Sequence, residues 1–169
     1  MSAGDLGLEE PEETETTFAG NARLKASFAA KASGLPALSD DSGISVDALG
    51  GAPGVYTADW AETPNGRDFS LAMSMVWKKL QSNNTLPPYK AKFNCVLCLA
   101  WPDGHDEIFN GIAVGQVIWP MRGKHGFGFD PMFQPDGYDL TFAEMLPAEK
   151  QPLTHRARAF AKLVANCIE

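Results

Sequence analysis

The fold of this chain is decided by one stretch of sequence, LPALSDDSGI at residues 35–44. Its first four residues form a short apolar run that is typical of a buried strand, and the run stops at Asp40 and Asp41. Ser42 and Gly43 follow, and an Asp-Ser-Gly sequence favours a turn, because glycine tolerates positive φ and aspartate hydrogen-bonds the turn backbone. The pattern therefore predicts a strand whose tip carries two carboxylates.

Two interpretations of these carboxylates are open. They can belong to an ordinary Asp-Ser-Gly turn, which is the most frequent role of such residues. Alternatively, they can serve a ligand site, because the strand tips of α/β proteins open into the ligand crevice. At such a tip, Asp40 and Asp41 would hold a metal ion or deprotonate a water molecule. The rest of the chain has to decide between the two.

Length and composition limit the classes of protein that the chain can belong to. With 169 residues and 44% hydrophobic content, we expect a single domain over residues 1–169. A formal charge of -7 disfavours non-specific binding to nucleic acid or an anionic membrane, although a divalent cation would let an acidic protein bind a polyphosphate. No apolar run approaches the roughly 20 residues of a membrane span. We expect a soluble, cytoplasmic protein without nucleic-acid or membrane partners.

The remaining pattern predicts an α/β fold with a mixed central sheet flanked by helices. Proline and glycine at residues 102–104 indicate a hairpin turn within an antiparallel meander. Cys95 and Cys98 lie in a strand, where residues three apart point to opposite faces, so we assign both to packing. The expected helices are 17–33, closed by Gly34, then 67–80 and one from Thr154, and the expected strands are 92–101, 107–109 and 113–119.

Lys25 stands out in the first helix, because it falls within the apolar stripe. We expect that stripe to consist of Phe18, Ala22, Phe28, Ala29 and Ala32. A lysine on a buried face either extends its ammonium group to the surface or points into an anion site. Both interpretations remain open at this stage.

The second half of the chain contains two weaker signals. Phe127 and Phe129 are separated by Gly128, which suits a ring-stacking surface, and Asp130 before Pro131 is biased towards extended backbone. His155 and Arg156 fall in the first turn of the last helix, where cations gain nothing from the helix dipole. They either bind an anionic or polar ligand or are two solvated side chains. The expected core face of this helix is Phe160, Leu163 or Val164, and Cys167.

Five stretches in one order carry a family resemblance: TTFAGNARLKA at 16–26, LPALSDDSGISVDALGGAPGVY at 35–56, GFGFDPMF at 126–133, TFAEM at 141–145 and THRARAF at 154–160. The chain closely resembles the inosine triphosphate pyrophosphatases, also called dITP/XTP pyrophosphatases. The resemblance implies hydrolysis of aberrant purine nucleoside triphosphates (dITP, ITP, XTP) to the monophosphate and pyrophosphate, which cleanses the nucleotide pool. It also implies Mg²⁺ as cofactor, a homodimer, and a nucleotide cleft between two lobes of an α/β fold.

The resemblance also implies a role for each matching residue. Asp41 would be the base for the attacking water. Glu13 and Asp41 would face Mg²⁺, together with Asp40. The substrate would be contacted by Lys25 at the triphosphate, by Ser42 at phosphate or metal-bound water, by Phe127 stacked on the purine, by Asp130 holding the base, and by Lys150, His155 and Arg156 closing over the base and reading its 6-oxo edge.

The family pattern begins with a strand and a Ser/Thr-x-Asn-x-x-Lys phosphate loop, whereas Met1 here aligns just before the acidic segment. We therefore expect an N-terminally short form of the domain. Two other functions remain open beside the pyrophosphohydrolase. The chain can be a nucleotide-binding remnant with impaired catalysis, or a pyrimidine-directed phosphohydrolase on the same fold.

Overall fold

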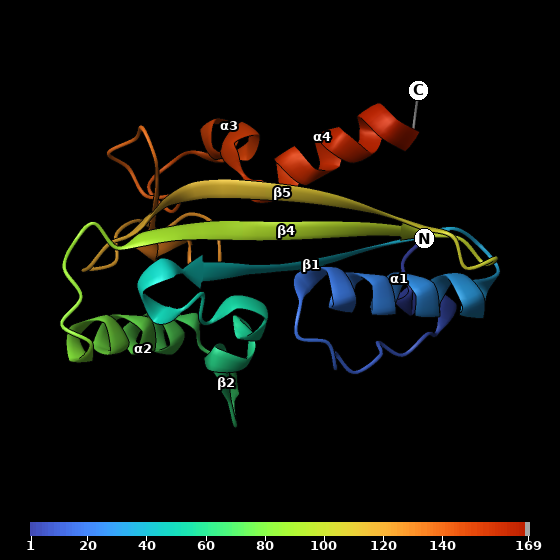
Figure 1. Cartoon of the computed structure of the whole chain (residues 1–169), viewed down its shortest axis with the longest axis horizontal. Coiled ribbons are helices and arrows are strands. Elements are labelled where there is room, and N and C mark those ends of the chain that lie inside the picture. The colour runs from blue at the N-terminus through green and yellow to red at the C-terminus, as the bar shows by residue number, and fades with distance from the viewer. Residues whose placement is uncertain (168–169) are drawn as a thin grey trace.

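A computed structural model describes residues 1–167 and contains one main sheet (Figure 1). The sheet has the strand order β1-β4-β5-β6, with β1 at Ala37–Val46, β4 at Lys90–Ala100, β5 at Asp106–Val117 and β6 at Phe133–Pro135. Two short strands, β2 at Glu62–Thr63 and β3 at Gly66–Arg67, form a separate hairpin. Short 3-10 helices, including Gly54–Tyr56 and Asp59–Ala61, connect β1 to this hairpin.

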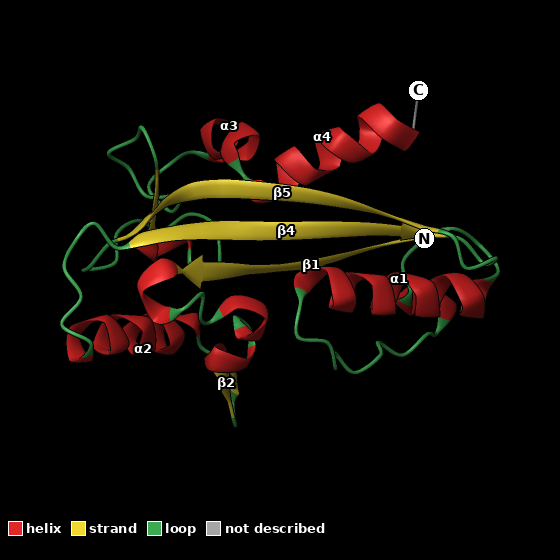
Figure 2. Ribbon diagram, viewed as in Figure 1, coloured by secondary structure: helices red, strands yellow, loops and turns green. Residues whose placement is uncertain are grey.

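Helices cover both faces of the sheet, as the sequence predicted (Figure 2). On one face α1 at Phe18–Ser33 packs with Val96 and Cys98. On the other face α2 at Phe69–Ser82 packs with Ile44 and Phe93, and α4 at His155–Cys167 packs with Cys95 and Leu97. The short helix α3 at Pro147–Lys150 precedes α4. The strand pairs of the described residues are all antiparallel, so the parallel pairing of a mixed sheet is not found among them. The reason is that β4 begins where β1 ends, with Val46 opposite Ala91, and a short turn then joins β4 to β5.

The ends of the helices follow the expected capping rules. Thr17 caps α1, because its Oγ1 accepts a hydrogen bond from the Gly20 N–H at 3.1 Å. Gly34 ends the same helix with a φ of 70°, a conformation that glycine adopts without strain. Thr154 caps α4 in the predicted way, with its Oγ1 accepting from the Ala157 N–H at 3.1 Å.

The predicted apolar stripe of α1 is partly wrong. The face that packs on the sheet consists of Ala22, Ala26 and Ala30, all fully buried against a cluster that includes Val96 and Cys98. Phe28, expected in the core, is 42% exposed. Small side chains bring the helix close to the sheet, and a phenylalanine does not fit in that gap.

The stretch 40–43 is not a turn, which corrects the first expectation from the sequence. β1 runs straight through it, with Asp40 opposite Leu97 and Asp41 opposite Val96 in the ladder with β4. Gly43 serves close approach, since a Cβ there would lie 2.4 Å from the carbonyl oxygen of Gly54. The carboxylates therefore lie within a strand, and the glycine lets residues 54–57 pack against it.

The cysteines and the middle strands agree with the sequence analysis. Cys95 packs with Ala159 and Leu163 of α4, whereas Cys98 packs with α1, so the two thiols face opposite sides of the sheet. Burial raises the pKa of each thiol to about 11, which keeps both protonated and unreactive. The expected strands 107–109 and 113–119 are in fact the single strand β5. Among the described residues, no helix is long and apolar enough to cross a membrane.

Candidate functional site

The two carboxylates of β1 point to opposite faces of the sheet, because side chains alternate along a strand. Asp41 lies on the α1 face, where its Oδ1 is 3.7 Å from Lys25 Nζ. Asp40 lies on the α4 face, where its Oδ2 accepts a hydrogen bond from Arg156 Nε at 2.8 Å. β1 is also the last strand of the sheet at this end of the strand order. A ligand that crosses its outer edge would meet both faces.

The α1 face holds a buried carboxylate between charged neighbours. Asp41 is 6% exposed, and Lys25 Nζ also donates to Glu13 Oε1 at 2.5 Å. Burial raises the pKa of Asp41 to about 6, against the opposing attraction of Lys25. Burial alone would lower the pKa of Lys25, but the hydrogen bond to Glu13 and the charge of Asp41 raise it. Lys25 therefore stays charged beside Asp41 instead of reaching out to solvent.

Asp41 also has an unsatisfied atom, because its Oδ2 is buried and no hydrogen-bond partner lies within the described part of the chain. A carboxylate oxygen left in this way suits a hard cation or a water molecule. Glu13 and Asp41 both reach Lys25, so together they offer the one or two carboxylates that Mg²⁺ uses beside substrate phosphates.

Asp40, the third carboxylate expected near the metal ion, lies apart from that pair. Its side chain lies on the other side of β1 and is already paired with Arg156. Within residues 1–167, no group of three or more His, Cys, Asp or Glu side chains is placed to hold a metal ion. Glu13 and Asp41 remain as the two carboxylates on the α1 side.

The α4 face contains a cavity of about 580 Å³. Its walls come from β1, the loop after β1, the segment 127–130, and the end of α3 through the first turn of α4. Of the residues predicted to bind substrate, it brings together Ser42, Phe127, Asp130, Lys150, His155 and Arg156, and leaves out Lys25. Most of the substrate-binding residues suggested by the resemblance therefore share one site.

Phe127 and Lys150 form one wall of the cavity and are held together by Asp130. Phe127 is 69% exposed, and Lys150 Nζ lies 5.6 Å from the centre of its ring. Asp130 is 4% exposed, accepts a hydrogen bond from the Phe127 N–H at 2.8 Å and forms an ion pair with Lys150. An exposed aromatic face beside a fixed cation suits a planar ligand that carries hydrogen-bond acceptors.

His155 and Arg156 also line the cavity, and the His155 ring packs on an aromatic ring. The imidazole stacks on Phe93 with ring centres 4.8 Å apart, and its Nδ1 is buried without a partner in the described residues. Burial, together with the nearby Arg156 cation, lowers the pKa of His155 to about 4. The ring is therefore neutral at pH 7 and offers both a donor and an acceptor nitrogen.

The structure adds two residues to the site and removes one from the expected core. Phe93 carries His155, and Thr57 fixes the loop wall by accepting from the Ile44 N–H at 3.0 Å. Neither has a local sequence signal, because both act through contacts with distant segments. Phe160, expected in the core of α4, is 50% exposed and borders the cavity, whereas Ala159 and Leu163 are buried.

These features define an α/β protein with a cavity for a planar, acceptor-rich ligand. On the other face of the edge strand, a lysine and a buried carboxylate are suited to an anion with its metal ion. Comparison with known proteins gives the family. A sequence model described as Ham1 family matches residues 2–166. The chain belongs to the Ham1 family, which confirms the resemblance drawn from the sequence.

Individual relatives agree with this assignment. The chain is 61% identical over 167 residues to a dITP/XTP pyrophosphatase of Ruegeria pomeroyi, which covers 99% of this chain and 82% of the relative. It is 57% identical over 179 residues to a dITP/XTP pyrophosphatase of Agrobacterium fabrum, with 99% and 84% coverage. A HAM1 protein from Coxiella burnetii matches the fold with a TM-score of 0.90 and 35% identity, over 96% of this chain and 82% of that one. The expected fold is therefore confirmed.

Proposed function

We propose that this protein hydrolyses aberrant purine nucleoside triphosphates, namely dITP, ITP and XTP, to the monophosphate and pyrophosphate. The observation that carries the proposal is the pairing of a base-sized cavity, walled by Phe127 and Arg156, with Asp41 and Lys25 across the edge of β1. The names of relatives above 50% identity support this reaction. The nucleotide pool that such an enzyme cleanses would place it in the cytoplasm.

The residues divide the reaction between the two faces of β1. On the α4 face, the purine would stack on Phe127, while Lys150, His155 and Arg156 would contact its polar edge. On the α1 face, Lys25 would neutralise part of the triphosphate charge. Asp41 would accept the proton of the attacking water, and a pKa of about 6 leaves it ionised at neutral pH and still basic enough for that task.

Glu13 and Asp41 are the residues that would hold Mg²⁺. The buried, partnerless Oδ2 of Asp41 fits this role, and the substrate phosphates would supply further oxygen ligands. When bound, the ion would offset the charge of the phosphates. Loss of activity on chelation, and its return with Mg²⁺, is the result we expect.

Selectivity for 6-oxo purines would depend on Arg156. A guanidinium donates to a carbonyl oxygen, whereas the 6-amino group of adenine presents another donor and leaves the arginine unpaired. We expect Arg156→Ala to weaken the binding of dITP far more than the binding of dATP. The difference should be roughly 1.5 to 3 kcal/mol, the free energy of one charged hydrogen bond. Equal losses for the two nucleotides would show that Arg156 serves phosphate or structure.

A pyrophosphate-release assay tests the proposed function directly. The purified chain, with Mg²⁺, should release pyrophosphate from dITP and XTP much faster than from dATP, dCTP or dTTP. Turnover that favours a pyrimidine would assign a pyrimidine-directed reaction instead. Nucleotide binding without any pyrophosphate release would assign a binding protein.

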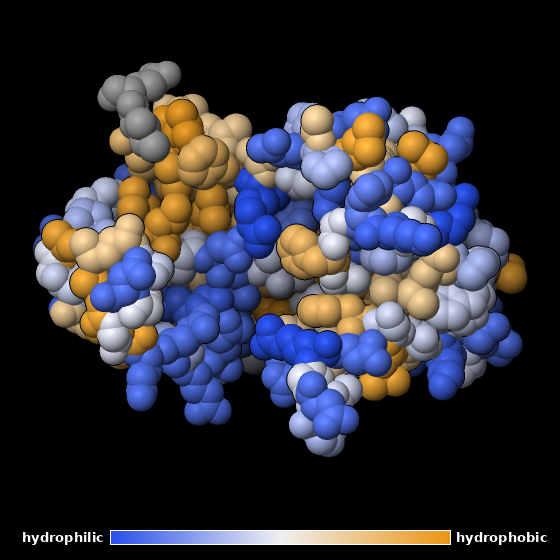
Figure 3. All heavy atoms as spheres, turned by 180° about the vertical axis from the view of Figure 1, so that it is seen from behind, coloured by the Kyte–Doolittle hydropathy of each residue, from blue (hydrophilic) through white to orange (hydrophobic). Residues whose placement is uncertain are grey.

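We also propose that the protein acts as a homodimer, which the family resemblance implies. Two half-exposed apolar side chains on α4, Phe160 and Val164, offer surface that such an association would bury. Figure 3 shows hydrophobic surface at the end of the molecule towards which α4 runs. Light scattering on the purified protein should give twice the 18.2 kDa chain mass, and a monomer at micromolar concentration would contradict this.

A further inference from the structure

Arg156 is held at one of its three nitrogens. Its Nε donates to Asp40 Oδ2 at 2.8 Å, and no residue in 1–167 accepts a hydrogen bond from either terminal nitrogen. The guanidinium lies at the wall of the cavity together with Asp40. The contact therefore fixes the side chain through Nε and leaves its terminal donors available to a ligand.

Asp40 is itself held in place by neighbouring strand residues. Its Oδ2 also accepts from Ser42 Oγ at 3.3 Å and lies 3.6 Å from the Cys95 Sγ donor. Ser42 is two residues further along β1, and Cys95 is on the adjacent strand β4. The acceptor that receives Arg156 Nε thus belongs to the continuous ladder of β1 with β4, and its position is defined before any ligand binds.

Charge also favours this contact. Arg156 lies in the first turn of α4, where the helix dipole disfavours a cation, and Lys150 lines the same cavity. The hydrogen bond with Asp40 raises the pKa of Arg156 and opposes both effects. Without the carboxylate, a half-exposed arginine with its many rotamers would turn towards water.

We propose that Asp40 is a positioning residue for Arg156, and that the pair sets the selectivity for 6-oxo purines. The inference rests on the proposed function and adds the residue that orients its selectivity group. It assigns Asp40 to base recognition on the α4 face, instead of to metal or phosphate. Loss of Asp40 should lower kcat/KM for a 6-oxo purine, which uses Arg156, and leave kcat/KM for a 6-amino purine almost unchanged.

A double-mutant cycle tests this assignment. The variants are Asp40→Ala, Arg156→Ala and the double variant, and the quantity is the ratio of kcat/KM for dITP to that for dATP. We expect Asp40→Ala to lower the ratio about 10-fold in the parent and less than 2-fold in the Arg156→Ala background, because coupled residues deviate from additivity. Asp40→Asn should recover part of the ratio, since its amide oxygen still accepts from Nε.

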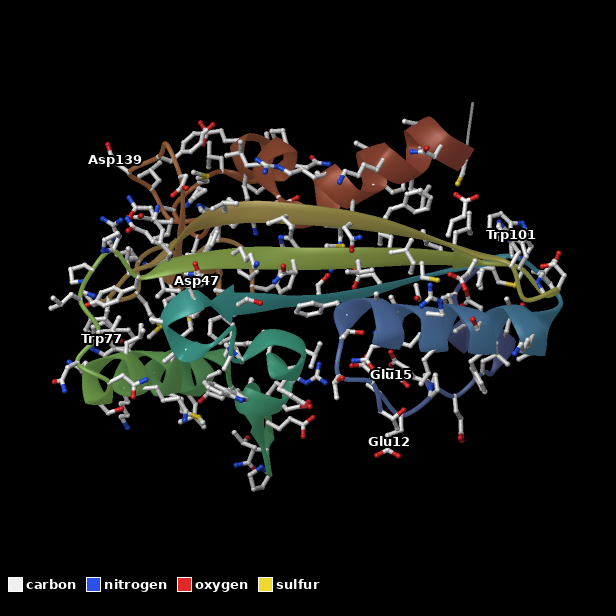
Figure 4. The ribbon with its side chains drawn as sticks, in the orientation of Figure 1. Glu12, Glu15, Asp47, Trp77, Trp101 and Asp139 are labelled. Atoms are coloured by element: carbon white, nitrogen blue, oxygen red, sulfur yellow. The ribbon has the colours of Figure 1, made fainter. Side chains whose placement is uncertain are left out.

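Two readouts separate positioning from other roles. The Mg²⁺ concentration for half-maximal rate should be the same in Asp40→Ala as in the parent, whereas a metal ligand would raise it. Asp47→Ala is the matched control, because Asp47 follows the end of β1, is exposed and forms no ion pair in the described structure (Figure 4). Its selectivity ratio should equal that of the parent.

Equal losses of kcat/KM for dITP and dATP in Asp40→Ala would overturn the assignment. It would also be overturned if Asp40→Ala lowered the selectivity ratio by the same factor with and without Arg156. Failure of the proposed function is a separate result, namely no pyrophosphate release by the parent. The cycle is then measured on the calorimetric Kd values of ITP and ATP. A parent that binds neither nucleotide more tightly than the other would overturn both proposals.

Discussion

Replacing Asp41 with Asn should make the folded protein more stable at pH 7.5. Burial raises the pKa of Asp41 from 3.8 to about 6, a difference of about two pH units. At about 1.4 kcal/mol per unit, ionised Asp41 costs the folded state about 3 kcal/mol. Asn keeps the shape without the charge, so it should recover a large part of that cost.

The direction of the Asp41 pKa shift determines how the stability of the folded protein depends on pH. Between pH 3.8 and 6 the unfolded chain ionises Asp41 while the folded chain keeps it protonated, so the parent loses stability as the pH rises through this window. Above pH 6 the full cost applies, and below about pH 4 it disappears. The stability gain of Asp41→Asn should therefore be largest above pH 6 and close to zero below pH 4, as measured by urea unfolding at fixed pH.

The same substitution should remove turnover. An amide accepts no proton from water, so we expect kcat for dITP to fall by about 10²-fold or more. In the parent, kcat/KM should fall on the acid side with an apparent pKa near 6, because the base must be ionised. A variant that keeps more than a tenth of the parent rate would show that Asp41 is not the base.

Glu12→Gln is the control for the stability measurement. Glu12 is exposed on the acidic segment before α1, with its side chain directed away from the sheet (Figure 4). Its substitution should change the free energy of unfolding by less than about 0.5 kcal/mol at either pH. If Asp41→Asn is no more stable than the parent at pH 7.5, ionised Asp41 is better compensated in the fold than its burial indicates.

Three further predictions concern single contacts. Gly43→Ala should destabilise the protein by about 1 to 3 kcal/mol, because its Cβ would meet the Gly54 carbonyl at 2.4 Å, whereas Gly4→Ala, whose Cβ would only touch Ser2 Oγ at 3.8 Å, should leave the melting temperature unchanged. Phe127→Ala should weaken the binding of dITP and dATP equally, by roughly 1 to 3 kcal/mol of stacking, without a change in melting temperature; a loss for dITP alone would contradict a stacking role. Lys25→Met should lower kcat for both nucleotides by about 10- to 100-fold, and a changed dITP-to-dATP ratio would mean that Lys25 contacts the base.

Much of the fold was accessible from the sequence because local chemistry fixes it. Thr17 begins α1 with a hydroxyl cap and Gly34 ends it with a positive φ, and neither signal needs the rest of the chain. The buried face of α1 was harder to predict, because the gap between the helix and the sheet accommodates the side chain of Ala26 but not that of Phe28. That gap depends on strands far away in the sequence.

The residue types of the site were also visible in the sequence. The motifs placed Asp41, Lys25, Phe127 and Arg156 in recognisable patterns, and the structure brings the last two into one cavity. The contacts of these residues were not visible, because Arg156 meets its carboxylate 116 positions away in the chain. No spacing rule covers such a distance.

The sequence by itself determined the family, the three longest helices, and the residues that carry charge and aromatic surface. Tertiary structure alone decided that Asp40 and Asp41, adjacent in sequence, serve different faces. The physical reason is the ladder with β4, which extends residues 40–43 into a strand where the sequence favoured a turn. In a strand, adjacent side chains point in opposite directions, so one carboxylate meets Lys25 and the other meets Arg156.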